Sequence, residues 1–274
     1  MSPHAKKNII PGFGLSLGLT ISFISLVVLI PMLTLVFQSS ALGWSGFWKT
    51  VLDPRILASF RVSFLCSFIA ALINGVFGLI LAWVLARYRF PGRRLIDGLI
   101  ELPFALPTAV AGISLTALYS DKGWIGEPLA RLGLKVAYTP VGIIVALTFI
   151  TLPFVVRTVQ PVLEQLDHVY EEAGRMLGAS PTLIFFRVIL PEIKPALLTG
   201  FALAFARALG EYGSVVFIAG NMPFKTEIAP LMIMIKLEQF NYGEATAVAL
   251  VMLGASFVIM FIINSIQARS AGFV

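Results

Sequence analysis

The chain has 274 residues, of which 58% are hydrophobic and only 12% are charged, and its mean hydropathy is +0.92. Soluble globular domains carry about 25% charged residues, so this composition excludes a soluble protein and indicates an integral membrane protein. The formal net charge is +6. We attribute it to basic residues that collect in cytoplasmic loops and set orientation, rather than to nucleic-acid binding.

Six apolar runs follow one another along the chain, and each reaches the roughly 20 residues that a helix needs to cross a bilayer. They lie at Leu15–Phe37, Leu57–Ala86, Leu99–Tyr119, Pro140–Thr158, Ala196–Ala219 and Ala245–Gln267. The sequence therefore predicts an all-α membrane protein with six transmembrane helices.

Four arginines are clustered in the short link after the second run: Arg87, Arg89, Arg93 and Arg94. The positive-inside rule places this cluster, and with it both termini, in the cytoplasm. Residues 159–195 then form the longest cytoplasmic loop. We expect residues 1–56 to hold the N-terminal tail, the first transmembrane helix and an outer loop, and residues 57–274 to form a five-helix core that includes the cytoplasmic loop.

The cytoplasmic loop is predicted to form two short helices. The first carries an apolar stripe at spacings of three and four residues: Leu163, Leu166, Tyr170, Ala173 and Leu177. Gly178 stands where a left-handed C-terminal cap belongs, and Ser180 followed by Pro181 is typical of the start of a helix. Such a segment could rest on lipid headgroups, but its polar face is acidic and anionic lipid would repel it. A protein partner therefore fits it better.

The same loop resembles the EAA loop of the permeases of ABC importers, whose pattern is E-A-A, three residues, G, nine residues and I-x-L-P. The matching positions are Glu172, Ala173, Gly178, Val188, Leu190 and Pro191, with Gly174 in place of the second alanine and Val188 in place of isoleucine. The resemblance implies a surface that docks into a groove of a cytoplasmic ATPase. The residues expected to form it are Tyr170, Glu171, Glu172, Ala173, Gly174, Met176, Leu177, Gly178, Ala179 and Ser180.

Further segments extend the resemblance over nearly the whole chain. They read PGFGLSLGLTISF, NGVFGLILAWVLARYRFPGR, LPFALPTAVAG, LPFVVRTVQPVLEQL, ALGEYGSVVFIAGN and IKLEQFNYGEATAVA. Together they resemble the T-type permeases of bacterial sulfate/thiosulfate importers, a family of type I ABC importers. The resemblance implies a multi-pass protein of the bacterial cytoplasmic membrane that moves sulfate or thiosulfate inward by alternating access.

The resemblance also implies partners: a second, W-type permease, a dimer of ATP-binding cassette ATPases that holds ATP and Mg²⁺, a sulfate/thiosulfate-binding protein outside the cell, and the surrounding lipid. Two alternatives stay open, a molybdate or tungstate importer permease and, from another class, an ion-coupled secondary transporter. An ion-coupled transporter would have no reason to carry the EAA loop.

The chain has no G-x-x-x-x-G-K-[ST] loop for nucleotide phosphates, and it has no pattern of metal ligands or paired acids. We therefore expect a permease subunit without catalytic residues, without a cofactor of its own and without a metal site. ATP hydrolysis would take place on a partner.

Charged residues inside apolar runs mark a candidate anion path. Arg207 and Glu211 fall in the fifth run at a spacing of four, so they can pair on one helix face. The pair either fixes helix packing, lowers the barrier for a dianion, or rearranges as a switch. Arg61, near the outer end of the second run, either attracts anions or extends its guanidinium to the interface.

Three prolines mark a candidate gate. Pro103 and Pro153 occur in similar sequences, LPFALPT and LPFVVRT, and Pro107 adds a further break. Proline removes a helical hydrogen bond and bends a helix, which suits a segment that opens and closes. Ordinary tolerance of proline in membrane helices explains the pattern equally well.

Overall fold

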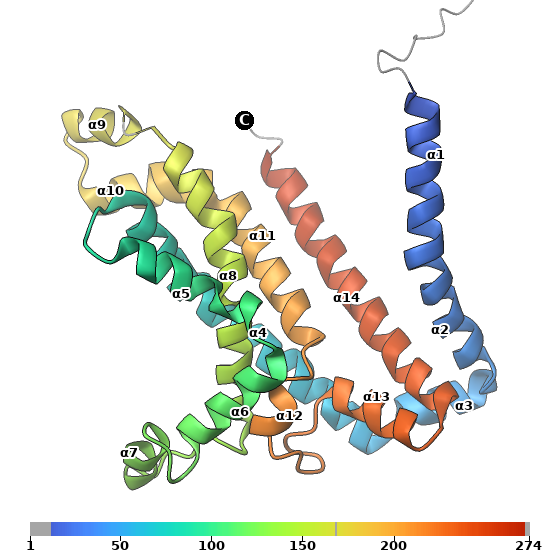
Figure 1. Ribbon diagram of the computed structural model, residues 1–274. Coiled ribbons are helices and arrows are strands. Elements are labelled where there is room, and N and C mark those ends of the chain that lie inside the picture. The colour runs from blue at the N-terminus through green and yellow to red at the C-terminus, as the bar shows by residue number, and fades with distance from the viewer. Residues whose placement is uncertain (1–11, 168, 272–274) are drawn as a thin grey trace, which may run out of the picture.

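The computed structural model describes residues 12–167 and 169–271, and within these ranges the chain folds into helices with no strand (Figure 1). Five helical segments are each long and apolar enough to cross a membrane. They are α1 (Phe13–Ile24) with the π-helical segment η1 (Ser25–Leu29) and α2 (Ile30–Ser40); α4 (Pro54–Arg87); α8 (Pro140–Gln165); α10 (Pro181–Ile184) with the π-helical segment η2 (Phe185–Ile189) and α11 (Leu190–Leu209); and α14 (Tyr242–Ala271).

The third apolar run forms two helices, α5 (Arg93–Ala105) and α6 (Thr108–Tyr119), which meet at an angle of 113°. The break lies at Leu106, whose backbone is extended, and at Pro107, the N-cap of α6. A residue that precedes proline is driven out of the helical region, so Pro107 accounts for the break. Pro103, by contrast, lies buried inside α5 without ending it. Five of the six predicted membrane-crossing segments are confirmed, and the third is a broken pair of helices that completes six when it counts as one span.

Short helices cover the two ends of the bundle. The remaining ones are α3 (Gly43–Val51), α7 (Gly126–Arg131), α9 (Val169–Met176), α12 (Val215–Ile218) and α13 (Ala229–Glu238). Figure 1 places α9 at one end of the molecule and α7, α12 and α13 at the other. We call these the α9 end and the α7 end. The start of α1 and the last turns of α14 both lie at the α9 end (Figure 1).

Helices α4, α8 and α11 form the centre of the bundle, and small residues bring them close together. A Cβ atom on Gly78 of α4 would lie 2.8 Å from Val155 Cβ of α8, and one on Gly200 of α11 would lie 2.9 Å from Val155 Cα. Glycine at both positions lets the three backbones approach around one valine, as is common between membrane helices. Asn74 of α4 adds hydrogen bonds to α8, because its Nδ2 donates to the Thr151 hydroxyl at 2.8 Å.

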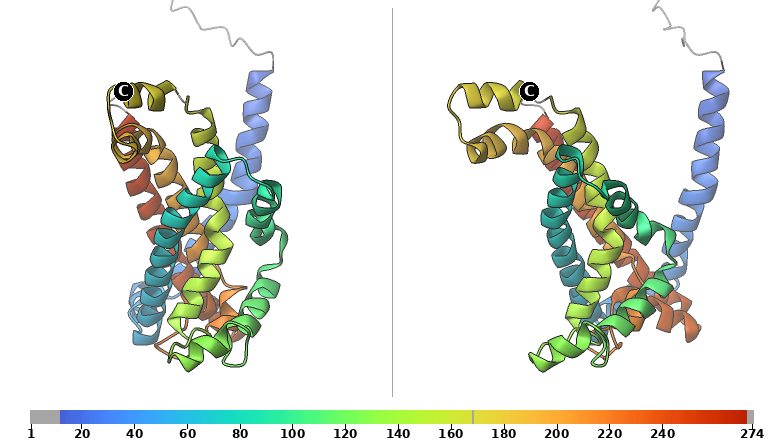
Figure 2. Two further views of the ribbon diagram at one scale, coloured as in Figure 1. Left: turned by 90° about the vertical axis from the view of Figure 1, so that its left-hand side faces the viewer. Right: turned by 60° about the vertical axis from the view of Figure 1, so that its left-hand side comes forward.

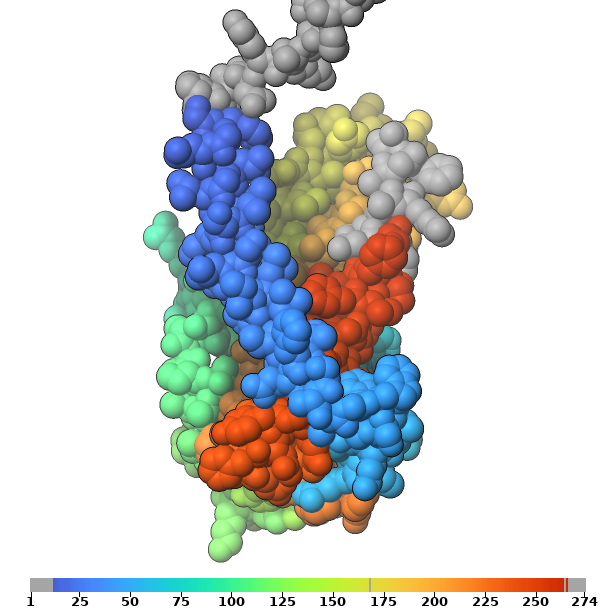
Figure 3. All heavy atoms as spheres, turned by 90° about the vertical axis from the view of Figure 1, so that its right-hand side faces the viewer, coloured from blue at the N-terminus to red at the C-terminus, as the bar shows by residue number. Residues whose placement is uncertain are grey.

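The first segment stands apart from this centre. Its α1 helix contains no buried residue, and it approaches the rest of the chain where α2 meets α14. Figure 1 shows α1, the upper half of the segment, standing apart from the other helices, and Figure 3 shows the whole segment in front of the bundle. An apolar helix without a partner in its own chain needs lipid or another subunit against it.

Candidate functional site

A helical arm projects from the α9 end of the bundle (Figure 2). It consists of α9, a turn at Gly178, and α10, and we call residues 169–184 the docking arm. The turn at Gly178 is left-handed, with φ of +79°. Two backbone hydrogen bonds close it: Ala179 N donates to Gly174 O at 3.0 Å, and Gly178 N donates to Arg175 O at 2.9 Å. This is the Schellman pattern that glycine favours at a helix end, so the predicted cap is confirmed.

The second helix of the arm begins as the sequence predicts. The Ser180 hydroxyl oxygen accepts a hydrogen bond from Leu183 N at 3.3 Å, and Pro181 occupies the first helical turn. However, this helix does not end at the prolines that follow. It continues through η2 into α11 as one helical segment, Pro181–Leu209. The second helix of the docking arm, α10, is therefore the beginning of a membrane-crossing segment rather than a separate surface helix.

The predicted apolar stripe from Leu163 to Leu177 is wrong as a single helix. Leu163 is buried in α8, which ends at Gln165, and the chain is extended at Leu166. The Asp167 Oδ1 atom then accepts a hydrogen bond from Val169 N at 3.1 Å and starts α9. Aspartate favours helix starts over helix interiors, which explains the break. The two membrane-crossing segments Pro140–Gln165 and Pro181–Leu209 are separated by residues 166–180, whereas the sequence predicts the cytoplasmic loop over residues 159–195.

Gly174 holds the two helices of the arm together. A Cβ atom at this position would lie 3.0 Å from Ile184 Cγ1, which is tighter than ordinary van der Waals contact. In the sequence, Gly174 is only a departure from the second alanine of the EAA pattern, whereas the structure gives it a packing role against α10. Ile184 itself is buried, so the arm has a small apolar contact of its own.

The outer face of the arm exposes large apolar side chains to solvent. Met176 is 89% exposed and Leu177 is 88% exposed, and Tyr170 is exposed as well. Glu172, Ala173, Gly178 and Ser180 are also exposed, whereas Gly174 and Ala179 are half-buried. Apolar side chains that project in this way mark a surface for a protein or membrane partner.

Glu171 faces the opposite way, toward the bundle. Its Oε1 lies 2.9 Å from Nη2 of Arg87, the last residue of α4, and the two side chains are 12% and 8% exposed. The Arg87 guanidinium lies 5.7 Å from the Trp83 ring centroid, and its Nη1 donates to Leu166 O at 3.4 Å. Glu171 therefore attaches the arm to α4 and contributes no free carboxylate to the exposed face.

A second ion-pair group joins α8 to α5. Arg157 of α8 contacts Asp97 Oδ1 with Nη1 and Glu101 Oε1 with Nη2, both at 2.8 Å. The sequence analysis missed this group, although Asp97 and Glu101 have the spacing of a shared helix face and Arg157 lies at the end of an apolar run. Close by, the rings of Phe104 and Phe154 meet edge to face at 5.2 Å. The two similar LPF sequences, with Pro103 and Pro153, thus lie against each other.

Arg207 and Glu211 form the predicted ion pair, but not inside one helix. Nη1 and Oε2 are 2.6 Å apart, while α11 ends at Leu209 and leaves Glu211 in the following turn. The predicted helical run to Ala219 is therefore wrong beyond Leu209. The other carboxylate oxygen of Glu211 accepts hydrogen bonds from the backbone and hydroxyl of Ser214 at 2.9 and 3.0 Å. Glu211 is 2% exposed, and both of its oxygens are used.

The turn that contains Glu211 packs against α6 directly after the Pro107 break. A Cβ atom on Gly213 would lie 2.2 Å from the Thr108 hydroxyl oxygen, and one on Gly112 would lie 2.4 Å from Ser214 O. Both contacts require glycine. The structure thus brings two predicted features together, the Arg207–Glu211 pair and the break at Pro107.

Arg61 lies elsewhere, on α4. It is exposed and lines a pocket of about 450 Å³ with Lys225, Phe224 and Pro140 among others. Neither Arg207 nor Glu211 lines this pocket. The candidate anion-path residues therefore form two separate groups.

Comparison with known proteins gives this arrangement a context. Residues 74–271 match the family described as the binding-protein-dependent transport system inner membrane component. The chain belongs to this family. Sequence relatives of this permease include the sulfate transport system permease proteins CysT of Salmonella typhimurium, 51% identical, and Escherichia coli, 50% identical. Each match covers 97% of this chain and 96% of the relative. The protein of the same name from a Synechocystis species is 46% identical over 90% of this chain and 87% of the relative.

Solved permeases of transporters share the fold. A bacterial ABC transporter that imports alginate matches with a TM-score of 0.77 and 16% identity over 94% of this chain and 96% of that one. The same kind of transporter in complex with a periplasmic protein matches with a TM-score of 0.75 and 19% identity, over 93% of each chain. The inward-facing MetNI methionine ABC transporter matches with a TM-score of 0.59 and 19% identity, over 79% of this chain and 96% of that one. These likenesses confirm the expected permease fold.

Proposed function

We propose that this chain is the membrane-spanning permease subunit of an ATP-driven importer for sulfate, with thiosulfate as a second substrate. The observation that carries the proposal is the identity of about half of all residues with CysT permeases over 97% of the chain. A permease subunit provides the path for the anion, and the energy for transport comes from ATP hydrolysis on another subunit.

The docking arm supplies the place where that other subunit attaches. Its exposed residues Met176 and Leu177 form an apolar tip, and Glu172 and Arg175 add charges beside them. An apolar helix that inserts into a groove is a common mode of docking between proteins. We assign the groove to an ATP-binding cassette ATPase dimer, which holds the ATP and Mg²⁺. This chain then needs no cofactor of its own.

We place the protein in the cytoplasmic membrane of a bacterium, with the α9 end in the cytoplasm. The arginines Arg87, Arg89, Arg93 and Arg94 lie between α4 and the start of α5, and the positive-inside rule supports this orientation. The α7 end then faces the binding protein that delivers the anion. The exposed first segment, Phe13–Ser40, is free to contact lipid and a homologous W-type permease.

The proposed transport step couples the arm to the anion path through one continuous helical segment. Helix α10 of the arm begins the segment Pro181–Leu209, and Arg207 lies near the far end of this segment. Closure of the ATPase dimer moves the arm, and the segment transmits the movement to the Arg207–Glu211 pair. Arg207 is the residue that we assign to the anion path. Pro107 and the two LPF prolines, Pro103 and Pro153, form the gate beside it.

Uptake into proteoliposomes that contain the whole complex tests the function. We expect accumulation of radiolabelled sulfate that requires ATP, persists without an ion gradient, and is competed by thiosulfate more strongly than by molybdate. Stronger competition by molybdate would reassign the substrate to molybdate or tungstate. Uptake that follows an ion gradient without ATP would refute the importer.

A further inference from the structure

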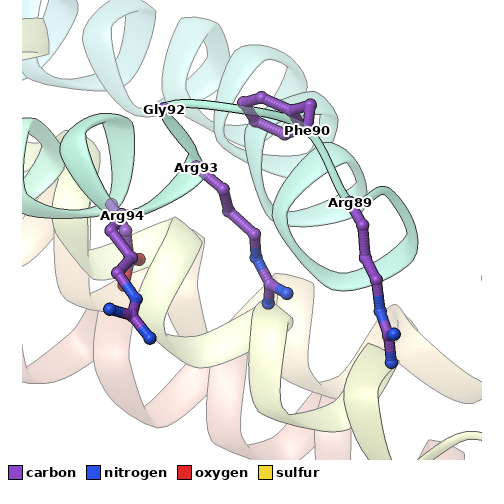
Figure 4. Close-up of a pocket in the computed structure, with 6 residues that line it drawn as sticks. Arg89, Phe90, Gly92, Arg93 and Arg94 are labelled. Atoms are coloured by element: carbon purple, nitrogen blue, oxygen red, sulfur yellow. The ribbon is translucent and has the colours of Figure 1, made fainter.

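A pocket rich in arginine lies where the chain turns from α4 into α5. It has a volume of about 470 Å³ and is lined by Arg89, Phe90, Gly92, Arg93, Arg94 and Asp97. The turn is sharp because Gly92 has a left-handed backbone with φ of +87°. The three guanidinium groups extend to the same side of this turn, as Figure 4 shows. Three positive charges close together repel one another, and a bound anion between them would offset this repulsion.

The acids near the pocket neutralise little of this charge. Asp97 is bound by Arg157 at 2.8 Å, so its carboxylate is already shared. Arg93 contacts Glu164 at 3.3 Å, but both side chains are well exposed, and such pairs contribute only about 0–1 kcal/mol. Within residues 12–167 and 169–271, Arg89 and Arg94 take part in no ion pair. At least two guanidinium groups are therefore available to a ligand.

The chemistry of the lining selects an oxyanion. Guanidinium is planar and offers pairs of N–H donors that match the oxygens of phosphate and sulfate. The pocket also lies at the N-terminus of α5, a helix of 13 residues, where the helix dipole favours negative charge. Phe90 also lines the pocket, but its ring lies on the side of the turn away from the three guanidinium groups (Figure 4).

We propose that Arg89, Arg93 and Arg94 form a binding site for an oxyanion at the α9 end, separate from the transport path. The ligand is either the phosphate of an anionic lipid headgroup or a free sulfate or phosphate ion. The site joins the end of α4 to the start of α5, so an occupied site holds the α4–α5 turn in place. This inference concerns a second site and does not depend on which anion the protein transports.

The test compares two variants of the full-length chain that each lose two positive charges. The test variant is Arg89→Gln with Arg94→Gln. The control variant is Lys122→Gln with Arg131→Gln, which removes two exposed charges at the α7 end. A third variant, Arg89→Lys with Arg94→Lys, keeps the charge that directs membrane insertion but loses the forked donors. Size-exclusion chromatography and thermal unfolding establish that each variant is folded.

Two measurements distinguish the ligand sources. Proteins extracted from vesicles of equal phosphatidylcholine and phosphatidylglycerol are examined by native mass spectrometry for retained lipid. Proteins in nanodiscs of phosphatidylcholine alone are titrated with sodium sulfate and with inorganic phosphate. A lipid site predicts that the wild type retains phosphatidylglycerol and that the glutamine test variant retains several-fold less, with the lysine variant in between. A free-ion site predicts that binding in the titration weakens about tenfold in the test variant, equivalent to about 1.4 kcal/mol.

Either result supports the site provided that the control variant behaves like the wild type. If the wild type and the test variant retain equal phosphatidylglycerol and bind sulfate and phosphate equally, or not at all, the arginines act only in membrane orientation and the proposal is wrong. Equal losses in the test and control variants would also overturn it, because they would show a general effect of net charge.

Discussion

Arg87 at the end of α4 and Glu171 in α9 form an ion pair with 2.9 Å between Nη2 and Oε1, shielded from solvent on both sides. It links a central helix of the bundle to an arm whose opposite face is exposed. An ion pair in this position fixes the angle of the arm, because a lost partner would leave the other charge partly buried. The two adjacent glutamates therefore have different roles: Glu171 attaches the arm to α4, and Glu172 is exposed on the outer face.

Replacement of Glu171 by Gln should loosen the arm without removing its docking face. We expect a loss of about 2 kcal/mol from the contact, between the values for exposed and buried pairs. Sulfate uptake should fall several-fold while the ATPase still copurifies. The swapped variant Arg87→Glu with Glu171→Arg should recover part of the uptake. If Glu171→Gln abolishes copurification of the ATPase as fully as substitution of the exposed Met176 and Leu177 does, Glu171 belongs to the docking face instead.

Replacement of Gly178 by Ala should weaken the docking arm at its turn. The left-handed backbone at φ of +79° costs a residue with a Cβ atom about 1–2 kcal/mol. We expect less ATPase to copurify, together with faster proteolysis within residues 169–184. Gly98→Ala in α5 is the matched control, since a Cβ atom there meets open space and its φ is not left-handed. It should leave copurification unchanged. An unaffected Gly178→Ala protein would show that the turn does not need its present shape.

Polar substitution of the exposed tip should separate docking from folding. Met176→Ser with Leu177→Ser removes two side chains that make no buried contact in this chain, so thermal unfolding should change by less than about 0.5 kcal/mol. Copurification of the ATPase should be lost. Leu132→Ser, which changes an exposed leucine outside the docking arm, should do neither. A double variant that still carries the ATPase at wild-type amounts would contradict the assigned docking face.

Arg207→Gln tests the anion path. It leaves the buried Glu211 carboxylate with Ser214 alone, so we expect loss of uptake together with a loss of stability of about 3 kcal/mol. The double variant Arg207→Gln with Glu211→Gln removes both charges and should recover most of the stability. If uptake recovers with it, the pair is structural. If uptake stays lost in a stable complex, Arg207 acts on the anion or on the gate.

The sequence predicts local features of the arm well because each depends on neighbouring residues only. Gly178 at the left-handed cap and Ser180 with Pro181 at the next helix start are such features. The end of α8 was not predictable, because Leu166 continues the apolar spacing and only Asp167 opposes it. The orientation of Glu171 was also hidden, since it depends on Arg87, which lies 84 residues earlier in the chain. The division at residue 57 and the contacts of the anion stay predictions.

The continuation of α10 into α11 has a physical cause that composition does not reveal. Proline inside a helix usually interrupts it, but Pro191 follows the π-helical segment η2 by two residues and the helix continues. A π turn is wider than an α turn and leaves more room for the proline ring beside the carbonyl four residues earlier, although Pro153 and Pro195 also lie inside helices without one. The same arrangement occurs at Pro31, which follows η1 by two residues. The helix is therefore interrupted at Pro107, whereas at Pro31 and Pro191 it continues past the proline.

The close contact of Val155 with Gly78 and Gly200 has a mechanical consequence. Gly200 lies about 28 Å along the helical segment from Pro181 but only about 10 Å from Arg207, at 1.5 Å per residue. With the backbones locked around one valine, the segment can tilt there more readily than it can slide. We expect the segment to act as a lever with unequal arms, so that a wide swing at the docking end produces a short displacement in the opposite direction at Arg207.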